Sequence, residues 1–232
     1  MIISEQVAFV TGANRGFGRH LTLELLSRGA KVYGGARNPE TINIPGVIPV
    51  KLDITNTQEV EAAVILAKDV TLLINNAGSA TGATLLDDKV EKIHLEFDTH
   101  FFGTLSMVRA FAPIIEKNGG GSILNVLSAL SWFSSGTVGA YSAAKAAEWA
   151  LTNDLRLNLY PHNIRVSGLH VGFMDTDMTT SLEVPKASPA DIAKIAINGI
   201  ESGSFEIIAD DNSRMIQGGL AGGVPALYPH LS

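Results

Sequence analysis

The chain has 232 residues, of which 46% are hydrophobic and 17% are charged, and its formal net charge is −6. This composition is typical of a folded globular protein and excludes an extensively disordered one. The negative charge, with no basic tail or stripe, argues against nucleic acid or an anionic membrane as a partner. The absence of cysteine excludes disulfides and thiolate metal sites.

The N-terminus lacks the basic region of a signal peptide, and no apolar run approaches the ~18 residues that span a bilayer. A cytoplasmic location is therefore expected. The length fits one α/β domain, and no repeat, low-complexity tract or linker divides residues 1–232.

Short β-branched apolar segments alternate with segments of helical periodicity along almost the whole chain. The predicted strands are residues 7–10, 31–34, 47–52, 70–74, 122–127, 165–169 and 205–209. The predicted helices are residues 17–28, 57–68, 90–117, 140–160 and 189–202. This alternation predicts parallel strands joined by right-handed crossover helices, and therefore a doubly wound α/β sheet between two layers of helices. Residues 176–188 are expected to form a mobile flap beside the site, and the glycine-rich tail after Asp210 a closing loop or a subunit contact.

The first predicted strand runs through a glycine-rich turn directly into a helix. Residues 11–18 of this turn read TGANRGFG. A helix N-terminus that follows such a turn offers backbone N–H groups and the positive end of the helix dipole to a phosphate. The pattern therefore predicts a dinucleotide site. The turn residues expected at the cofactor are Gly12, Asn14, Arg15, Gly16, Phe17 and Gly18.

The charges near the second predicted strand indicate which dinucleotide binds. Arg37 follows that strand, no carboxylate lies there to take a ribose 2′-hydroxyl, and Arg15 lies within the glycine turn. Two guanidinium groups suit a 2′-phosphate, so NADP(H) is expected rather than NAD(H). Asp53, followed by Ile54, is a candidate for contact with the adenine, although Asp53 could instead cap the next helix.

A tyrosine and a lysine lie four residues apart near the start of a predicted helix. Tyr141 and Lys145 share one helix face, so the phenol and the ammonium can point at one place. A lysine cation and the positive ring of an oxidised nicotinamide both favour phenolate, which makes the tyrosine a plausible acid and base for a carbonyl oxygen. Ser128 ends another predicted strand, where the crevice of an open α/β sheet lies.

Taken together, these motifs give the chain a resemblance to the short-chain dehydrogenase/reductase family over nearly its whole length. The matching elements, in the family's order, are residues 11–18, the NNAG of residues 75–78, Ser128 and the Tyr141-x-x-x-Lys145 pair. The resemblance implies a Rossmann-type fold with a mostly parallel sheet of seven strands and NAD(P) as cofactor. It also implies a homodimer or homotetramer built on two long central helices.

The resemblance also implies a role for each motif residue. Tyr141 would be the acid/base, Ser128 would hold the substrate oxygen, and Lys145 would bind the nicotinamide ribose and lower the pKa of the tyrosine. The family's cofactor-discriminating positions match Arg15 and Arg37, in agreement with the charge argument. The residues after the fourth strand that would border the cofactor are Asn76, Ala77 and Gly78.

The chain departs from the family pattern at two positions. His100 replaces an asparagine that supports a proton-relay water, and it is either a relay residue or a satisfied interior histidine. After the sixth strand, Val171-Gly172 replaces the usual Pro-Gly, while Thr176 remains in place to meet the nicotinamide carboxamide.

The residues expected around the reacting carbon are apolar or small, with no arginine to clamp an acid. They are Ser79, Ala80, Ala129, Leu130, Trp132, Phe133, Val171, Phe173 and Met174. They favour a neutral, fairly hydrophobic ketone or aldehyde, or the corresponding alcohol, although Trp132 and Phe133 could simply pack under the flap.

Three other functions fit the sequence less well. Zinc-dependent dehydrogenation is disfavoured because the chain has no cysteine and its six histidines lack zinc spacing, so no metal is expected. A sugar-nucleotide epimerase would need a longer chain. A non-catalytic NADP(H)-binding protein is the main alternative, but it would not need Ser128, Tyr141 and Lys145 together.

Overall fold

A computed structural model describes residues 1–231 of the chain. Seven strands form one sheet in the order β3-β2-β1-β4-β5-β6-β7, and every neighbouring pair is parallel. The strands are β1 (Val7–Thr11), β2 (Lys31–Ala36), β3 (Val47–Lys51), β4 (Leu72–Asn75), β5 (Gly121–Val126), β6 (Ile164–His170) and β7 (Glu206–Ile208). The chain reverses direction across the sheet between β1 and β4, which is where ligands bind in sheets of this kind.

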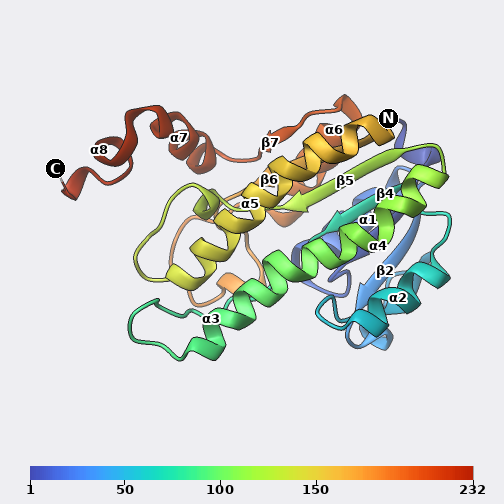
Figure 1. Cartoon of the computed structure of the whole chain (residues 1–232), viewed down its shortest axis with the longest axis horizontal. Helices are drawn as coiled ribbons and strands as arrows, with labels where there is room; N and C mark the ends of the chain where they lie inside the picture. The colour runs from blue at the N-terminus through green and yellow to red at the C-terminus, as the bar shows by residue number, and fades with distance from the viewer. Residues whose placement is uncertain (232) are drawn as a thin grey trace.

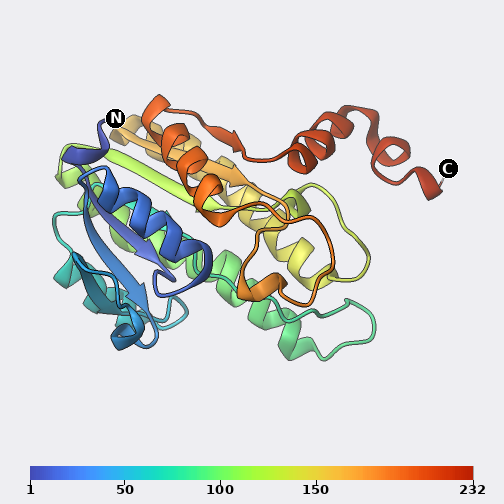
Figure 2. The same ribbon diagram turned by 180° about the vertical axis from the view of Figure 1, so that it is seen from behind.

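Helices cover both faces of the sheet and complete the predicted three-layer Rossmann-type fold (Figures 1 and 2). One layer contains α1 (Gly16–Ser27) and α6 (Pro189–Ser202), which pack against each other. The other contains α2 (Thr57–Leu66), α4 (Thr104–Lys117) and α5 (Gly139–Leu159). The predicted fold class is confirmed, and the sheet is entirely parallel over residues 1–231 rather than mostly so.

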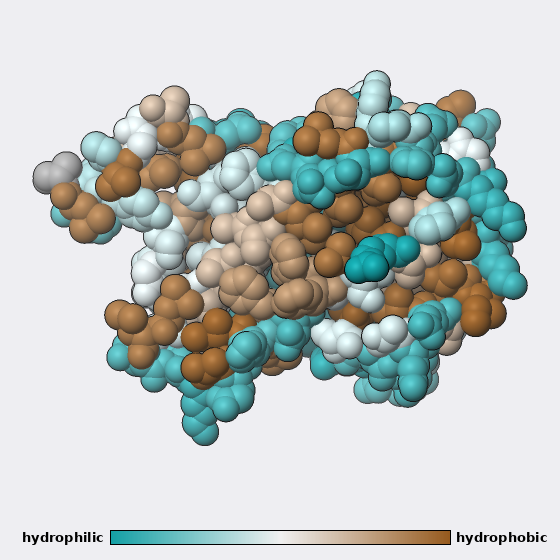
Figure 3. All heavy atoms as spheres, in the orientation of Figure 1, coloured by the Kyte–Doolittle hydropathy of each residue, from teal (hydrophilic) through white to brown (hydrophobic). Residues whose placement is uncertain are grey.

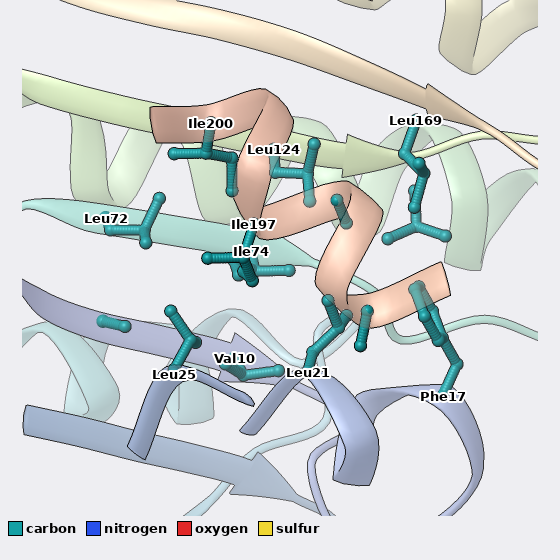
Figure 4. Close-up of a cluster of buried hydrophobic side chains, with 14 of the residues drawn as sticks. Val10, Phe17, Leu21, Leu25, Leu72, Ile74, Leu124, Leu169, Ile197 and Ile200 are labelled. Atoms are coloured by element: carbon teal, nitrogen blue, oxygen red, sulfur yellow. The ribbon is translucent and has the colours of Figure 1, made fainter. Parts of the chain in front are cut away.

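The five strands between the edge strands β3 and β7 are largely buried on both faces, which explains why they read as mostly apolar runs. In β1, Ala8 and Val10 face α1 and α6, whereas Phe9 faces the layer of α2 and α4. Figure 4 shows the first cluster, where Leu21 of α1 and Ile197 of α6 meet over the sheet. Each fully buried side chain of this kind stabilises the fold by about 1.5–3 kcal/mol. The two clusters hold the carboxyl ends of the strands in place.

The segment predicted as one helix over residues 90–117 contains an irregular turn. It consists of α3 (Val90–Phe97), a π-helical turn (Asp98–Gly103) and α4. Gly103 lies so close to its surroundings that a Cβ there would come within 2.7 Å of Cδ1 of Ile54. The prediction of a regular helix was wrong at this turn, because the turn depends on a contact distant in sequence. The wide turn holds His100 in the interior.

The tail after Asp210 is helical, so the closing loop expected from its glycines is wrong. It forms α7 (Asp211–Gly219) and α8 (Gly223–Leu227), which extend beyond the sheet (Figure 1). The Asp210 side chain starts α7 by accepting a 2.7 Å hydrogen bond from the backbone N–H of Ser213. Within residues 1–231, no helix combines the length and the apolar character needed to cross a membrane.

Candidate functional site

The glycine turn adopts a backbone that only glycine tolerates well. Gly12 and Gly16 have positive φ angles of 67° and 52°. A Cβ on Gly18 would lie 2.1 Å from the carbonyl oxygen of Gly12, so any side chain there would push the turn and α1 apart. These three positions therefore keep the backbone of the turn close to the start of α1.

The first turn of α1 is open to an anion. Its N-cap residue, Arg15, makes no capping hydrogen bond, whereas Asn56 caps α2 and Ser188 caps α6 through their side chains. The first N–H groups of α1 therefore have no side-chain acceptor, which is the property that a phosphate site requires.

The segment after β4 is tied to the glycine turn. The Thr11 hydroxyl accepts hydrogen bonds from the N–H groups of Asn76 and Ala77, both at 2.9 Å. The Asn76 amide donates back to the Thr11 carbonyl at 2.8 Å. Gly78 contacts the buried histidine, because a Cβ there would lie 2.8 Å from Cε1 of His100. The glycine turn that follows β1 and the predicted cofactor residues that follow β4 are thus brought together.

The two arginines expected at the 2′-phosphate lie at the surface. Nη1 of Arg15 is 3.5 Å from Oδ2 of Asp177. The Arg15 side chain is 68% exposed and the Asp177 side chain is 73% exposed. Arg37 is exposed and has no hydrogen bond or ion pair within residues 1–231. Both guanidinium groups are accessible to a ligand.

The other predicted cofactor residues differ in how much of them is accessible. Phe17 and Ile54 are buried in the two core clusters. The Asn14 amide donates to the Thr41 hydroxyl at 3.0 Å. The Asp53 carboxylate accepts hydrogen bonds from the N–H and the hydroxyl of Thr55. Since Asn56 caps α2, the interpretation of Asp53 as the helix cap is wrong.

Ser128 follows β5 and is held by its neighbours and by β6. Its hydroxyl accepts a 3.1 Å hydrogen bond from the N–H of Leu130, and its own N–H donates to the Ser131 hydroxyl at 3.2 Å. Its carbonyl lies 3.1 Å from Nδ1 of the buried His170. Trp132 is half-buried and stacks on the His170 ring at a centroid distance of 3.6 Å.

Tyr141 lies in the first turn of α5, one turn before Lys145, whose Nζ is 5.8 Å from the centre of the phenol ring. Burial raises the pKa of Tyr141, the Lys145 ammonium lowers it, and the Glu148 carboxylate raises it again. A hydrogen bond with Ser128 lowers the pKa, but the net result is above the ordinary value of a phenol. Ser128, Tyr141 and Lys145 are thus brought together, and the phenol is protonated in the free protein.

His100 lies against the ring of Tyr141, edge to face, with centroids 5.2 Å apart. Its side chain is almost fully buried, and its Nε2 lies 3.0 Å from the carbonyl oxygen of Ser79 and 3.4 Å from Oε2 of Glu96. His100 therefore contacts the Tyr141 side of the site rather than packing elsewhere in the core.

Two buried carboxylates at the site were missed in the sequence. Glu96 accepts hydrogen bonds from the Ser79 hydroxyl at 2.6 Å and the Thr81 N–H at 2.5 Å. Burial acts to raise its pKa, but hydrogen bonds from His100, Ser79 and Thr81 lower it to about 2. Glu148 pairs with Lys145. The sequence contained one signal for these carboxylates. Glu96 precedes His100 by four residues and Glu148 follows Lys145 by three, and residues at these spacings lie side by side on a helix.

The segment after β6 lies beside the glycine turn. A Cβ on Gly16 would be 3.8 Å from Cβ of Thr176, and the N–H of Gly172 donates to the Asp210 carboxylate at 2.5 Å. Phe133 stacks on Tyr228, whose hydroxyl accepts a 2.9 Å hydrogen bond from the N–H of Ser134. The helical tail is thereby joined to the loop that follows Ser128. Over residues 1–231, no group of three or more histidine or acidic side chains could hold a metal ion.

Comparison with known proteins agrees with this arrangement. The family model described as short chain dehydrogenase matches residues 6–186, which include the glycine turn, Ser128, Tyr141 and Lys145. The chain belongs to the short-chain dehydrogenase family. It is therefore an oxidoreductase of that family, as its motifs indicated.

Two relatives and one solved structure illustrate the similarity. The chain is 33% identical to 3-ketodihydrosphingosine reductase of Bacteroides thetaiotaomicron, over 77% of the chain and 68% of the relative. It is 30% identical to the oxidoreductase YusZ of Bacillus subtilis, over 90% of the chain and 83% of the relative. A short-chain dehydrogenase from Burkholderia cenocepacia, crystallised with NADP, matches with a TM-score of 0.95 and 39% identity, covering 100% of this chain and 99% of that one.

Proposed function

We propose that this protein is an NADPH-dependent carbonyl reductase that interconverts a neutral, fairly hydrophobic ketone or aldehyde and its alcohol. The observation that carries the proposal is that Tyr141, Lys145 and Ser128 lie together at the carboxyl end of β5. A non-catalytic NADP(H)-binding protein would need the turn but not this group.

The glycine turn and the arginines suit NADP(H). The uncapped start of α1 offers N–H groups to the pyrophosphate, and the accessible Arg15 and Arg37 suit a 2′-phosphate. The similar Burkholderia protein binds NADP in its crystal structure, which supports the same choice here. The other residues proposed to contact the cofactor are Gly12, Asn14, Gly16, Phe17, Gly18, Asp53, Ile54, Asn76, Ala77, Gly78, Gly172 and Thr176.

In the proposed reaction, the cofactor supplies a hydride to the carbonyl carbon, and the chain supplies the proton. The Ser128 hydroxyl holds the carbonyl oxygen beside Tyr141, which donates its phenolic proton as negative charge develops on that oxygen. The Lys145 ammonium stabilises the resulting phenolate and binds the nicotinamide ribose. In the reverse direction the phenolate accepts the proton of the alcohol.

The substrate class follows from the polarity of the surroundings. The side chains expected near the reacting carbon are mostly apolar, and none of them is a cation that could bind a carboxylate or phosphate. The relative named 3-ketodihydrosphingosine reductase, whose name specifies a ketone, supports this class.

The proposal is tested by measuring NADPH oxidation with a panel of ketones and aldehydes. We expect Tyr141→Phe to lower kcat by at least ~1000-fold while NADPH still binds, because the proton donor is lost and the ring is kept. The matched control is Tyr160→Phe, which removes a hydroxyl from a tyrosine that is 62% exposed at the other end of α5. Undiminished turnover in Tyr141→Phe would refute the mechanism.

A further inference from the structure

The carboxylate of Glu148 is buried beside the proposed catalytic lysine. Glu148 is 2% exposed and Lys145 is 5% exposed, and Oε2 of the glutamate lies 2.7 Å from Nζ of the lysine. Removing two charges from water is unfavourable by several kcal/mol each unless they are paired with good geometry. A buried pair at this position therefore calls for a functional explanation, because apolar side chains could fill the same space.

Two of the three N–H groups of Lys145 are already engaged by the protein. One donates to the carbonyl oxygen of Val126 at the end of β5, and another to Glu148, each at 2.7 Å. An ammonium has three donors in a tetrahedral arrangement, so fixing two of them fixes the direction of the third. The third N–H is left for a ligand.

The far side of the Glu148 carboxylate is fixed by a neighbouring helix. Its Oε1 accepts a 3.1 Å hydrogen bond from the hydroxyl of Thr104, the first residue of α4. Its Oε2 is 3.8 Å from Nδ1 of His100, a buried nitrogen with no hydrogen-bond partner within residues 1–231. Glu148 thus joins α5 to the π-helical turn and α4, close enough to Tyr141 for its charge to act on the phenol.

We infer that Glu148 is a positioning residue, which holds the Lys145 ammonium against β5 and directs its third N–H toward the nicotinamide ribose. This inference rests on the proposed function, since it requires a dinucleotide beside Lys145. Glu148 acts through the lysine and does not itself touch the reacting atoms.

The same carboxylate has an electrostatic consequence for Tyr141. The charged or titratable groups that face the phenol are Lys145, Glu148, Glu96 and His100. Both carboxylates oppose the formation of phenolate and raise the pKa of Tyr141, against the effect of Lys145. Removing the charge of Glu148 should therefore lower the pH at which Tyr141 ionises.

The test uses Glu148→Gln, which keeps the shape of the side chain and removes its charge. The dissociation constant of NADPH is compared with that of adenosine 2′,5′-bisphosphate, which lacks the nicotinamide ribose. We expect NADPH to bind about 3- to 10-fold more weakly, while the bisphosphate binds as it does to the unaltered protein. The control is Asp154→Asn, which removes a carboxylate from an exposed position of α5 and should change neither constant.

A second readout is the ionisation of Tyr141, followed by the near-ultraviolet absorption of phenolate. Subtracting the titration of the same protein with Tyr141→Phe isolates this residue. We expect Glu148→Gln to lower the midpoint by about half a pH unit or more. A merely structural role would weaken both ligands together and leave the midpoint in place.

Unchanged NADPH affinity in Glu148→Gln would overturn the inference, as would equal weakening of NADPH and the bisphosphate. Should that variant fail to fold, Glu148→Asp keeps the charge and withdraws it from Lys145. The inference predicts weaker NADPH binding in that variant, and unaltered binding would overturn it. Failure here differs from failure of the proposed function, which would appear as undiminished turnover in Tyr141→Phe.

Discussion

At the scale of single residues, the choice of cofactor depends on two guanidinium groups that no strong interaction holds. The 3.5 Å pair between Arg15 and Asp177 joins two exposed side chains, so it contributes little to stability and can be exchanged for a ligand. Arg37, at the end of β2, is exposed as well. Their charge and their positions in the sequence motifs pointed to these arginines, because discrimination between NADPH and NADH depends on which charges lie near the 2′-position of the ribose.

We expect the Arg15→Ala/Arg37→Ala double variant to bind NADPH about 10- to 100-fold more weakly. Each hydrogen bond to the charged phosphate contributes about 1.5–3 kcal/mol to the binding free energy, and water recovers part of this when it solvates the phosphate in the variant. NADH affinity should change little, because NADH has no 2′-phosphate. Fluorescence titration with both cofactors measures this, with Arg109→Ala on the exposed side of α4 as control. Equal weakening of both cofactors would show that neither arginine binds the 2′-phosphate.

At the scale of elements, Glu96 connects α3 to the segment that follows β4. Its carboxylate accepts hydrogen bonds from Ser79 and Thr81 and lies 3.4 Å from His100, and its side chain is fully buried. The carboxylate therefore holds the segment after β4 against α3 and His100. A pKa of about 2 means that the folded state stabilises the ionised form.

Glu96 should therefore make stability depend on pH. Its pKa is about 2 in the folded chain, compared with an ordinary value of 4.5. The ionised carboxylate therefore contributes fully to the free energy of unfolding above about pH 4.5, and this contribution is lost as the pH falls toward 2. We expect Glu96→Gln to lower the free energy of unfolding near neutral pH by on the order of 3 kcal/mol, and this difference to shrink as the medium becomes acidic. Urea unfolding over a range of pH measures it, with the exposed Glu91→Gln as control. A difference that stays constant with pH would contradict the assignment.

The elements also show where sequence reasoning succeeds. All seven strands were predicted within two residues at each end. The central strands are buried on both faces and are therefore mostly apolar, whereas the edge strands β3 and β7 were recognised from short β-branched apolar runs. The π-helical turn was not predicted, since it depends on the contact of Gly103 with Ile54. The helices of the tail were missed because glycine has a low helix propensity, although Asp210 was a visible capping signal.

The residues of the candidate site, too, could be predicted from the sequence only in part. Ser128, Tyr141 and Lys145 were predicted to lie together because the proposed chemistry requires those side chains at recognisable spacing, and the structure brings them together. Glu148 and Glu96 were missed because a single glutamate in a helix is ordinarily solvated, and only the packing of α3, α4 and α5 buries these two.

At the scale of the whole molecule, hydrophobic side chains are exposed on the face that α4 and α5 form. Figure 3 shows hydrophobic surface gathered over these two helices, in the orientation of Figure 1. Leu157 on α5 is 78% exposed, and Phe102, before α4, is 56% exposed. Apolar surface of this kind favours association, and we propose that this face joins the subunits of a homodimer or homotetramer.

We expect the Phe102→Glu/Leu157→Glu double variant to dissociate such an oligomer, because two like charges would be buried in a symmetric contact. Sedimentation equilibrium measures the mass. The control is Met215→Glu, at a 69% exposed position of α7 away from this face. An oligomer that persists in the double variant but dissociates in the control would place the contact at the tail instead.

The central claim is that Tyr141 loses its proton readily only when an oxidised cofactor lies beside it. The direct measurement is the titration of Tyr141 by phenolate absorption, with Tyr141→Phe subtracted, in the absence and presence of saturating NADP⁺. We predict a midpoint above the ordinary phenol value of ~10 in the free protein, and a fall of about two pH units or more when NADP⁺ is bound. A midpoint that does not move with NADP⁺ would contradict the account.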